Sequence, residues 1–552
     1  MTLPNLLPFI MVVAFACGIV QAVEPADLVV RSATVITVNA AAPRARAFAI
    51  RGGTFAFVGE DAAVTDFIGP ATTVLDLAGK TVTPGFIDAH AHPVPVYAEE
   101  SAWAPVDCRP RAVKDVAELI AALERKAQRT PPGTWVVGEG YENLKLGRHP
   151  TRWDLDRASE RHPIIVHHYS GHERVVNSLA LRTAGIAADV ADPPGGRFGR
   201  DRRGELTGLL QEKATLGVSI GFDPPAAETR AAYTEGYRRL LARGVTTVGV
   251  AGTSLPTART LELARSDDAP LRLCIALGGK AIQEAVTRKP PTAADEHGVR
   301  YGAIKVFHGG SVSAHTGWVS EPYVGIDARY GVIPQRSQEE LNRLLLTIHD
   351  AGWQAWVHCN GDREIDMVVS AFERILATSP RKSHRHRLEH CSVMTPALLE
   401  RIKPLDLVLV PHSYMWEHGD ILDAYHPRLW DDIHPTKSAI DLGIVRAGHS
   451  DGPGVSSCDP LMHIQALVTR KSLAGRVYGP AQRITPEQAI TVWTLNGAYA
   501  TCTETERGSI EVGKLADFVV LDADPTAVDA DAIMNIPLRA TYVGGRKVYQ
   551  AR

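Results

Sequence analysis

The sequence predicts an α/β protein: a (β/α)8 barrel, a small β-sandwich domain built from both chain ends, and an inserted subdomain after the first barrel strand. Three observations lead to this prediction. Short apolar strands alternate with amphipathic helical stretches through the middle of the chain. Strands joined by turns with paired glycines occur at both ends. Histidines and an aspartate stand where several of the central strands end.

Length and composition indicate a globular enzyme made of several structural units. The chain has 552 residues, which is too many for a single hydrophobic core of ordinary size. It is 45% hydrophobic and 22% charged, which is typical of globular proteins. The net charge is −3 and no long single-sign run occurs, which argues against a nucleic-acid partner and against a membrane-surface partner.

The first 22 residues resemble a secretory signal peptide. They are mostly apolar, contain no acidic residue and end in Val20-Gln21-Ala22, although no Lys or Arg precedes the apolar run. We therefore expect export to the periplasm or the medium, with no stable membrane association after cleavage. An anchor helix is the alternative, but its apolar run is shorter than the ~20 residues that a span needs. If the segment is not a signal, the protein is cytoplasmic.

The two chain ends have similar sequence patterns. Residues 23–83 and 491–552 both contain short strands with Gly-rich turns. The segments IRGGTFAFVG and TYVGGRKVYQ each predict a strand, a turn with paired glycines and another strand. We expect both ends to build one β-sandwich, with the barrel, residues 84–490, inserted between them.

Eight candidate barrel strands follow one another in the middle of the chain. Helical stretches such as QEELNRLLLTIHDAG separate several of them. The interval 103–235 is longer than one crossover, so it is expected to hold the inserted subdomain. The strands are GFIDAHAH, GVTTVGVAG, LRLCIAL, GAIKVFHGG, WQAWVHCNG, HRLEHCS, LDLVLVPHS and GIVRAGHSDG.

The first of these strands carries His90 and His92 at alternate positions, with Asp88 before them. Alternate side chains of a strand point to the same face. Two imidazoles on one face can bind one metal ion. A half-buried strand with polar residues facing water would show the same alternation, so the pair alone does not decide.

Further metal-binding residue types stand at the ends of later strands. His358 and His390 end the fifth and sixth strands, and Asp451 ends the eighth. Lys305 lies on the fourth. In a (β/α)8 barrel the C-terminal ends of the strands form the catalytic face. The whole set therefore predicts a metal centre far more specifically than any single histidine.

These segments resemble the amidohydrolase superfamily of metal-dependent hydrolases, and in particular its YtcJ-like (amidohydrolase 3) group, which includes N-substituted formamide deformylases. The first-strand motif GFIDAHAHP, the later motifs VHCNGDREIDMVVSAFE, RLEHCSV and SDGPG, and the insertion segments YSGHERVVNSLAL and GELTGLLQE carry the resemblance over nearly the whole mature chain. It implies a TIM-type barrel, a sandwich from both termini, and one or two divalent metals per chain, commonly zinc. Relatives are often homodimers.

The residue types suit this chemistry. Neutral imidazoles and carboxylate oxygens bind zinc. We assign metal binding and proton transfer to Asp451, which would take the proton of the attacking water and pass it to the leaving nitrogen. Four histidines are assigned as metal ligands: His90, His92, His358 and His390.

Lys305 has a special role by resemblance. A lysine at this strand of the family carries a carbamate whose two oxygens bridge two metals. A lysine paired to a nearby acid is the alternative. Related sequences have an Asp-Gly pair shortly after this lysine, whereas this chain has Gly309-Gly310, preceded by His308. This difference is expected to alter the substrate pocket or the number of metals.

Three more residues are expected to bind substrate. His172 matches a family position near the substrate, where it would hydrogen-bond the carbonyl oxygen; a histidine that caps a turn is the alternative. His412, at the end of the seventh strand, and Trp318 are expected to line the pocket, although such residues also serve as packing. His434, His449 and His463 lack a supporting pattern and are expected not to be ligands.

Together these features predict an exported, metal-dependent amidohydrolase that cleaves a C–N bond of an amide, N-acyl or N-formyl type in a small molecule. The same site acting on a cyclic amide, a carbamate or an ester is one alternative. A metal- or ligand-binding protein without catalysis is another, but such a protein would have no need of the proton shuttle Asp451.

Overall fold

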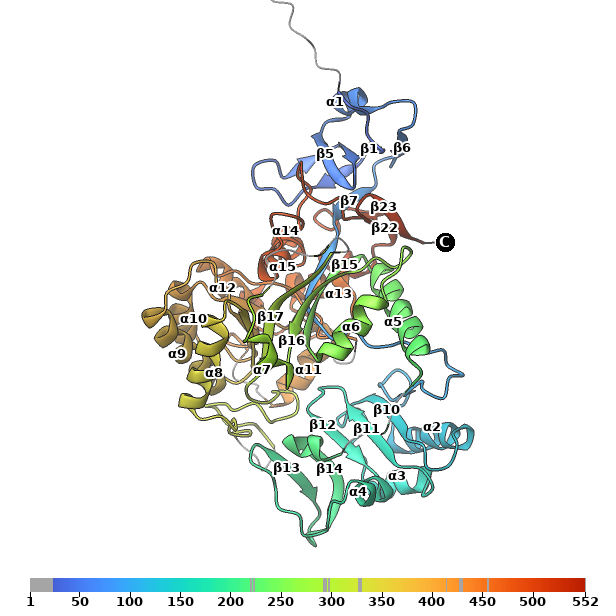
Figure 1. The fold of residues 1–552 in the computed structure, drawn as a ribbon, viewed down its shortest axis with the longest axis vertical. Coiled ribbons are helices and arrows are strands. Elements are labelled where there is room, and N and C mark those ends of the chain that lie inside the picture. Colours follow the sequence, from blue (N-terminus) through green and yellow to red (C-terminus); the bar gives the residue numbers. More distant parts are fainter. Residues whose placement is uncertain are drawn as a thin grey trace, which may run out of the picture.

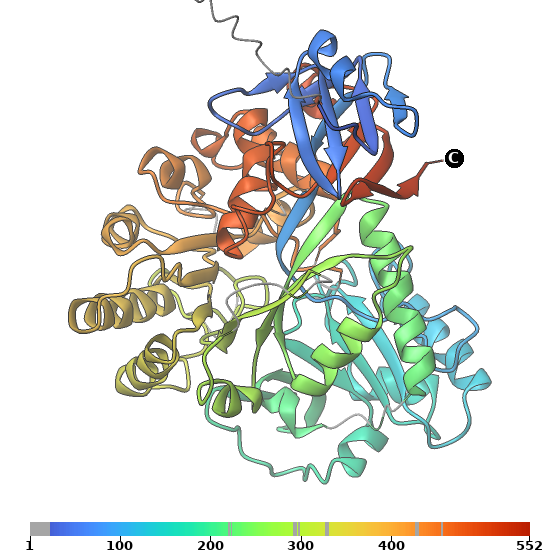
Figure 2. The same cartoon turned by 45° about the horizontal axis from the view of Figure 1, so that its top comes forward.

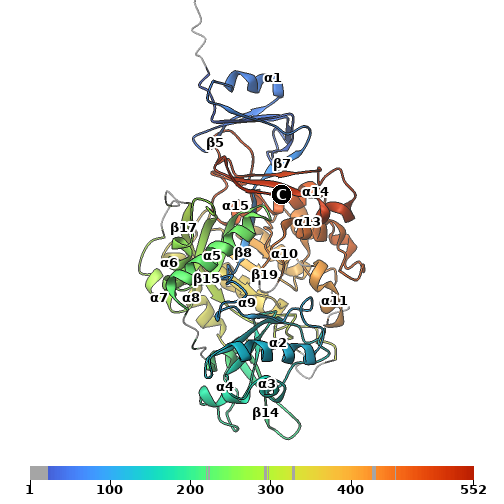
Figure 3. The same ribbon diagram turned by 90° about the vertical axis from the view of Figure 1, so that its right-hand side faces the viewer.

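The structure is a computed structural model that describes residues 23–551, apart from 219–220, 222–223, 291–294, 296–297, 326–329, 414, 426–429 and 454–455. The expected signal peptide, residues 1–22, lies outside the described residues. Three parts are stacked along the long axis of the molecule: the sheets of the two chain ends, the barrel in the middle, and the insertion at the opposite end (Figures 1 and 3).

Seven parallel strands form the barrel sheet, in the order β20-β19-β18-β17-β16-β15-β8. Most of their residues are buried, because helices cover the outside and side chains fill the inside. The (β/α)8 fold class predicted from the strand pattern is confirmed. The strands are β8 (Phe86–Ala91), β15 (Val245–Thr253), β16 (Arg272–Leu277), β17 (Val299–Phe307), β18 (Gln354–Cys359), β19 (Arg387–His390) and β20 (Val408–Pro411).

The eighth position of the barrel is filled by residues 444–451, which do not form a regular strand. On one side, the N–H of Ala447 donates to the carbonyl of Leu409 in β20 (2.9 Å). On the other side, the N–H of Ala89 in β8 donates to the carbonyl of Gly448 (3.0 Å). The segment therefore closes the ring between the last and first strands, although its pairing is too short to count as the predicted eighth strand.

Helices pack around the barrel, and the buried residues of several of them form the main hydrophobic cluster with the strands. Ser337 and Thr395 cap two of them by accepting the N–H of Glu340 and Leu398. The helices are α5 (Ala226–Leu241), α6 (Leu255–Leu263), α7 (Ala281–Ala285), α8 (Gln338–Asp350), α9 (Asp362–Thr378), α10 (Pro396–Ile402), α11 (Met415–Tyr425), α12 (Thr436–Asp441), α13 (Pro460–Thr469), α14 (Pro486–Val492) and α15 (Leu495–Ala500).

Two sheets hold the chain ends together. One has four strands, β5-β4-β1-β6, and the other has six, β23-β22-β21-β7-β2-β3, in which β21 from the C-terminal end pairs antiparallel with β7 from the N-terminal end. Figure 2 shows the two ends side by side. The strands are β1 (Leu28–Arg31), β2 (Thr34–Ile36), β3 (Arg44–Ala45), β4 (Ala47–Arg51), β5 (Thr54–Gly59), β6 (Thr73–Asp76), β7 (Thr81–Pro84), β21 (Phe518–Leu521), β22 (Leu538–Val543) and β23 (Arg546–Gln550).

The insertion carries a mixed sheet of its own, in the order β13-β14-β12-β11-β10-β9. It lies beyond the C-terminal ends of the barrel strands (Figure 1), where the ring of Tyr169 stacks on that of His418 in α11 at 4.9 Å between centroids. Its elements are β9 (Val106–Asp107), α2 (Val116–Arg129), β10 (Val136–Tyr141), α3 (Arg152–Ala158), β11 (Ile164–His168), β12 (Glu173–Val176), α4 (Ser178–Thr183), β13 (Gly196–Arg200) and β14 (Leu206–Glu212).

Two negative observations apply to the described part of the chain. None of its helices combines the length and the apolar character that a membrane crossing requires. Its six cysteines are free, four of them buried and two half-buried.

Candidate metal centre

An imidazole near the end of the first barrel strand is oriented by its neighbours. His90 is fully buried, and its Nδ1 pairs with Oε2 of Glu389 in β19. Arg387 donates to both oxygens of Glu389, at 2.7 and 2.8 Å. Burial favours the neutral acid, but Arg387 and His90 outweigh it and hold the pKa of Glu389 well below its usual range. The ionised Glu389 accepts a hydrogen bond from Nδ1–H of His90, so Nε2 carries the lone pair of the neutral ring.

That lone pair faces a carboxylate. Nε2 of His90 lies 3.3 Å from Oδ1 of Asp451, and Nε2 of His92 lies 3.2 Å from the same oxygen. Donor atoms of the three residues all lie within 4.8 Å of one another. The lone pair of a neutral His90 and an anionic oxygen repel each other unless a cation or a proton lies between them. The arrangement therefore fits a divalent metal ion, which imidazole and carboxylate ligands bind together.

Lys305 of β17 reaches the same place. Its Nζ lies 3.2 Å from Nε2 of His90, and the side chain is 1% exposed. Burial lowers the pKa of Lys305 to about 8, while the carboxylates of Glu389 and Asp451 oppose that shift. The amine of Lys305 is therefore easier to deprotonate than that of a solvent-exposed lysine.

His358 of β18 also presents a free lone pair. Its Nε2 donates to the carbonyl of Gly310 (2.9 Å), which leaves Nδ1 buried and without a hydrogen-bond partner among the described residues. Burial holds the pKa values of His358 and His390 well below the usual range, so both rings are neutral. Their ring centroids are 4.6 Å apart, and Nδ1 of His390 lies 3.8 Å from Oδ2 of Asp451.

Two of these residues have strained backbones. His390 has φ of 68° and Asp451 has φ of 57°, in the left-handed region that non-glycine residues rarely adopt. Asp88 holds the backbone next to Asp451 in place. Its Oδ1 accepts a hydrogen bond from the N–H of Ser450 (3.1 Å), and its Oδ2 accepts one from the Ser450 hydroxyl. Asp88 thus positions the loop that carries Asp451. Strain of this kind is typical of functional sites.

The structure explains the glycine at position 309. A Cβ added there would lie 2.0 Å from the carboxyl carbon of Glu364. The carboxylate of Glu364, at the start of α9, accepts the N–H groups of Gly310 (2.9 Å), Trp318 (2.6 Å) and Asn360 (2.8 Å). A carboxylate from a helix thus occupies the space beside Gly309 and holds the loop whose carbonyl orients the imidazole of β18.

The insertion contributes one imidazole to the mouth of the barrel. His172 lies between β11 and β12, and its ring centroid is 5.0 Å from that of His358. Its Nδ1 lies 2.9 and 3.1 Å from the two oxygens of Glu212. Burial lowers the pKa of His172, but Glu212 outweighs burial and the net shift is upward. The upward shift favours the protonated ring, in which Nε2–H is a second donor besides the Nδ1–H that faces Glu212.

The other two predicted substrate contacts differ in position. His412 follows β20, and its ring stacks on His390 at 4.5 Å between centroids, so it belongs to the imidazole cluster. Trp318 lies in the loop after β17, and the guanidinium of Arg363 lies over its ring at 5.3 Å. A residue that sequence reasoning missed, Phe307, is 54% exposed, and its ring centroid lies 5.2 Å from that of His358.

Sequence reasoning also missed the acidic partners. Glu389 stands one residue before His390 in the motif RLEHCSV, but nothing local shows that it pairs with a histidine 299 residues away. Glu212 and Glu364 are likewise recognisable only through their spatial partners. Alternation within β19 was the one available signal, since Arg387 and Glu389 share a strand face.

A parallel barrel with imidazoles, a carboxylate and a lysine at the C-terminal ends of its strands defines a metal-dependent hydrolase. Comparison with known families identifies the group. The model of the amidohydrolase family matches residues 73–549, and the chain belongs to this family.

Two relatives illustrate the similarity in sequence. The N-substituted formamide deformylase of Arthrobacter pascens is 29% identical over 547 residues, which cover 95% of this chain and 98% of the relative. The putative amidohydrolase YtcJ of Bacillus subtilis is 29% identical over 87% of this chain and 91% of its own length.

Solved structures share the fold. An uncharacterized metal-dependent hydrolase from Pyrococcus horikoshii superposes with a TM-score of 0.71 at 21% identity, over 91% of this chain and 99% of its own. A metal-dependent hydrolase from Pyrococcus furiosus gives 0.68 at 22% identity, over 90% and 99%. Both similarities support the barrel architecture.

Proposed function

We propose that the protein hydrolyses a C–N bond of an amide, N-acyl or N-formyl type in a small molecule. The convergence of His90, His92 and Asp451 on one point carries this proposal, since their donor atoms lie within 4.8 Å of one another. The formamide deformylase activity named for a relative of nearly full-length similarity supports the type of bond.

The chain's own residues supply the proton transfers. A divalent metal bound by the imidazoles would polarise the carbonyl and lower the pKa of its water. Asp451 accepts a proton from the attacking water, and the oxygen adds to the carbonyl carbon. When the C–N bond breaks, the same carboxyl returns the proton to the leaving nitrogen. His172, oriented by Glu212, donates a hydrogen bond to the carbonyl oxygen as negative charge develops there.

The environment of Lys305 supports a carbamate. A neutral amine can add to CO₂ and release one proton, and burial lowers the pKa of this amine to about 8. The ammonium form would instead place a positive charge 3.2 Å from the lone pair of His90, in the same space as a metal ion. An anionic carbamate removes that conflict and offers two oxygens as ligands.

Phe307 favours a substrate with an apolar substituent. Its ring is 54% exposed beside Lys305, whose Nζ lies 5.1 Å from the ring centroid. Exposed aromatic surface next to a polar centre is typical of small-molecule sites. We expect an aryl or alkyl group on the nitrogen or acyl side of the substrate to pack on this ring.

The variant Asp451→Asn tests the proposal. Removal of the proton shuttle should lower kcat on N-substituted formamides and N-acyl amines by about 100-fold or more, because general acid–base catalysis contributes about that much. Asp441→Asn, which removes an exposed carboxylate paired with Lys437, is the matched control and should keep full activity. Equal turnover by all three proteins, or no turnover of any amide by the metal-loaded wild type, would contradict the proposed reaction.

Lys305→Ala tests the bridging carbamate. The variant should lose activity and at least one metal per chain, and added short-chain carboxylates should restore part of both. Lys471→Ala, at an exposed ion pair with Asp531, should behave as wild type. Full metal content and full activity in Lys305→Ala would remove the bridging role while leaving the hydrolase assignment in place.

A further inference from the structure

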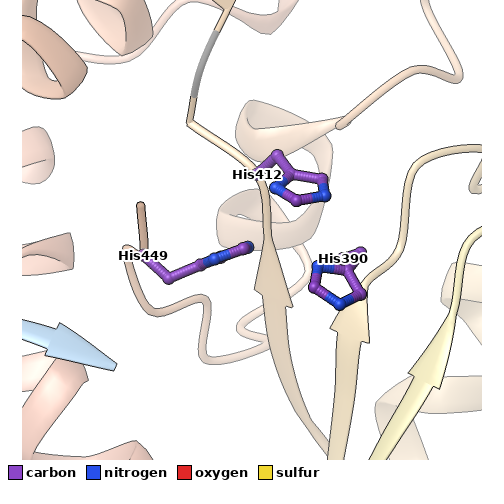
Figure 4. A group of neighbouring side chains, drawn as sticks. All are labelled: His390, His412 and His449. Atoms are coloured by element: carbon purple, nitrogen blue, oxygen red, sulfur yellow. The ribbon is translucent and has the colours of Figure 1, made fainter. Parts of the chain in front are cut away.

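We propose that His390, His412 and His449 form a second cation site beside the hydrolytic centre, and that this site takes a divalent transition metal of the zinc type. One donor atom of each ring lies within 4.8 Å of the others, and all three side chains are buried. The rings come from three neighbouring positions of the barrel: the end of β19, the residue after β20, and the closing segment. Figure 4 shows them around a common space.

His449 carries the argument. It is fully buried, and neither of its ring nitrogens has a hydrogen-bond partner among the described residues. Nδ1 of His390 is also buried and without a hydrogen-bond partner in that part of the chain. Unsatisfied buried polar atoms are rare, and each costs about 1–3 kcal/mol. A cation bound among the rings would be bound by one lone pair from each neutral imidazole.

The ring positions suit a shared ion. The centroid of His412 lies 4.5 Å from that of His390 and 4.6 Å from that of His449, and the third pair is 5.4 Å apart. Imidazole nitrogens are ligands of zinc, copper, nickel and cobalt, whereas calcium and magnesium require oxygen ligands. A set of three imidazoles also leaves a coordination position open, as catalytic zinc sites do.

The site is next to the hydrolytic centre, and none of its three histidines belongs to the group of His90, His92 and Asp451. The ring of His449 lies 5.1 Å from that of His90 between centroids, and Nδ1 of His390 lies 3.8 Å from Oδ2 of Asp451. His390 thus stands between both groups, while His412 and His449 belong to the second alone. His449, expected from its sequence context not to be a ligand, becomes one by its position. The proposal does not depend on which bond the enzyme cleaves.

Metal analysis of variants tests this site without any substrate. Wild type, His449→Asn and His412→Asn are loaded with zinc, dialysed and measured by elemental analysis. Both variants should hold one cation per chain fewer than wild type. His384→Asn is the matched control: it removes a buried imidazole at the other end of β19, where Asn can still accept the N–H of His386. Its metal content should equal that of wild type.

Crystals of the zinc-loaded wild type and of His449→Asn locate the loss and show that the fold persists. An anomalous peak among the three rings that disappears in the variant, while the peak at His90 and Asp451 remains, is the expected result. Unchanged metal content in both variants, or no anomalous peak among these rings in the wild type, would overturn the proposal. Failure of the proposed reaction would leave these peaks unaffected.

Discussion

Single residues at the mouth of the barrel act through hydrogen bonds that define which nitrogen is free. Glu389 accepts a hydrogen bond from Nδ1–H of His90, and the carbonyl of Gly310 accepts one from Nε2–H of His358. Each bond leaves the opposite nitrogen as a lone pair facing the site. Such partners normally orient metal-binding histidines and raise their basicity.

Gly309 has little freedom to change. Its φ of 103° disfavours any side chain, and a Cβ would meet the carboxyl of Glu364 at 2.0 Å. We expect Gly309→Ala to lower the free energy of unfolding by about 2–5 kcal/mol, the sum of left-handed strain and overpacking. Chemical denaturation followed by circular dichroism measures this loss.

A control separates the two causes. Gly133→Ala has a φ of 83° but nothing within 4 Å of the added Cβ, so it should lose only about 1–2 kcal/mol. Equal losses in the two variants would mean that Glu364 moves away without cost. The double variant Gly309→Asp/Glu364→Ala, which returns the carboxylate to the loop, should regain part of the stability.

Elements of the insertion depend on local capping. Asp154, the third residue of α3, accepts the N–H of Thr151 (2.8 Å) and two bonds from Arg148 (2.6 and 2.9 Å). Burial favours the neutral acid, but these hydrogen bonds outweigh it and lower the pKa of Asp154 to about 2. A depressed pKa contributes stability above the pKa of the unfolded chain, near 3.8, and that contribution is lost as pH falls toward 2.

Asp154→Asn should therefore destabilise the protein at neutral pH by about 1–2 kcal/mol. This value is smaller than the pKa shift alone would give, because Arg148 is half-exposed and solvent screens its charge. The difference from wild type should shrink as pH falls below about 4, where the wild-type carboxylate also becomes protonated. Urea titrations over this pH range measure it. Glu118→Gln, at the same capping position of helix α2 and exposed to solvent, should cost less. A loss for Asp154→Asn that does not depend on pH would contradict the linkage.

At the scale of the whole molecule, a buried ion pair connects the barrel to the sheet of the chain ends. Arg272, the first residue of barrel strand β16, donates to both oxygens of Asp517, which lies just before β21 in the sheet of the chain ends (2.7 and 2.9 Å). The pair is buried, and the same carboxylate accepts the N–H of Gly544 (2.8 Å). One ion pair thus connects the barrel to the strands of the C-terminal end.

Asp517→Ala leaves the guanidinium of Arg272 buried without its partner. We expect a loss of about 3–5 kcal/mol in the free energy of unfolding, measured by denaturant titration. Asp522→Ala breaks the exposed pair with Arg539 and should cost less than about 1 kcal/mol. Similar small losses for both variants would show that the barrel and the end sheets are not coupled through this pair.

Much of the barrel was predictable because its signals are local. Alternation marked β8 and placed His90 and His92 on one face, and apolar runs marked β15 to β20. The prediction of an eighth strand was wrong in one respect: residues 444–451 pair with β20 and β8 through a few hydrogen bonds and one isolated bridge, Leu409 to Arg446, and do not form a regular strand. The local sequence pattern does not show how many residues of such a segment pair with the neighbouring strands.

Periodicity and residue type along the chain thus specified the strands, the face on which polar residues stand and the candidates for metal binding, because each of these depends on neighbours a few positions away. Folding alone decided the rest. It paired Glu389 with His90 and Glu212 with His172, put Glu364 beside Gly309, and brought His449 close to His390 and His412. These contacts form when the barrel closes and the insertion packs on it, so the residues next to each partner in the sequence do not predict them.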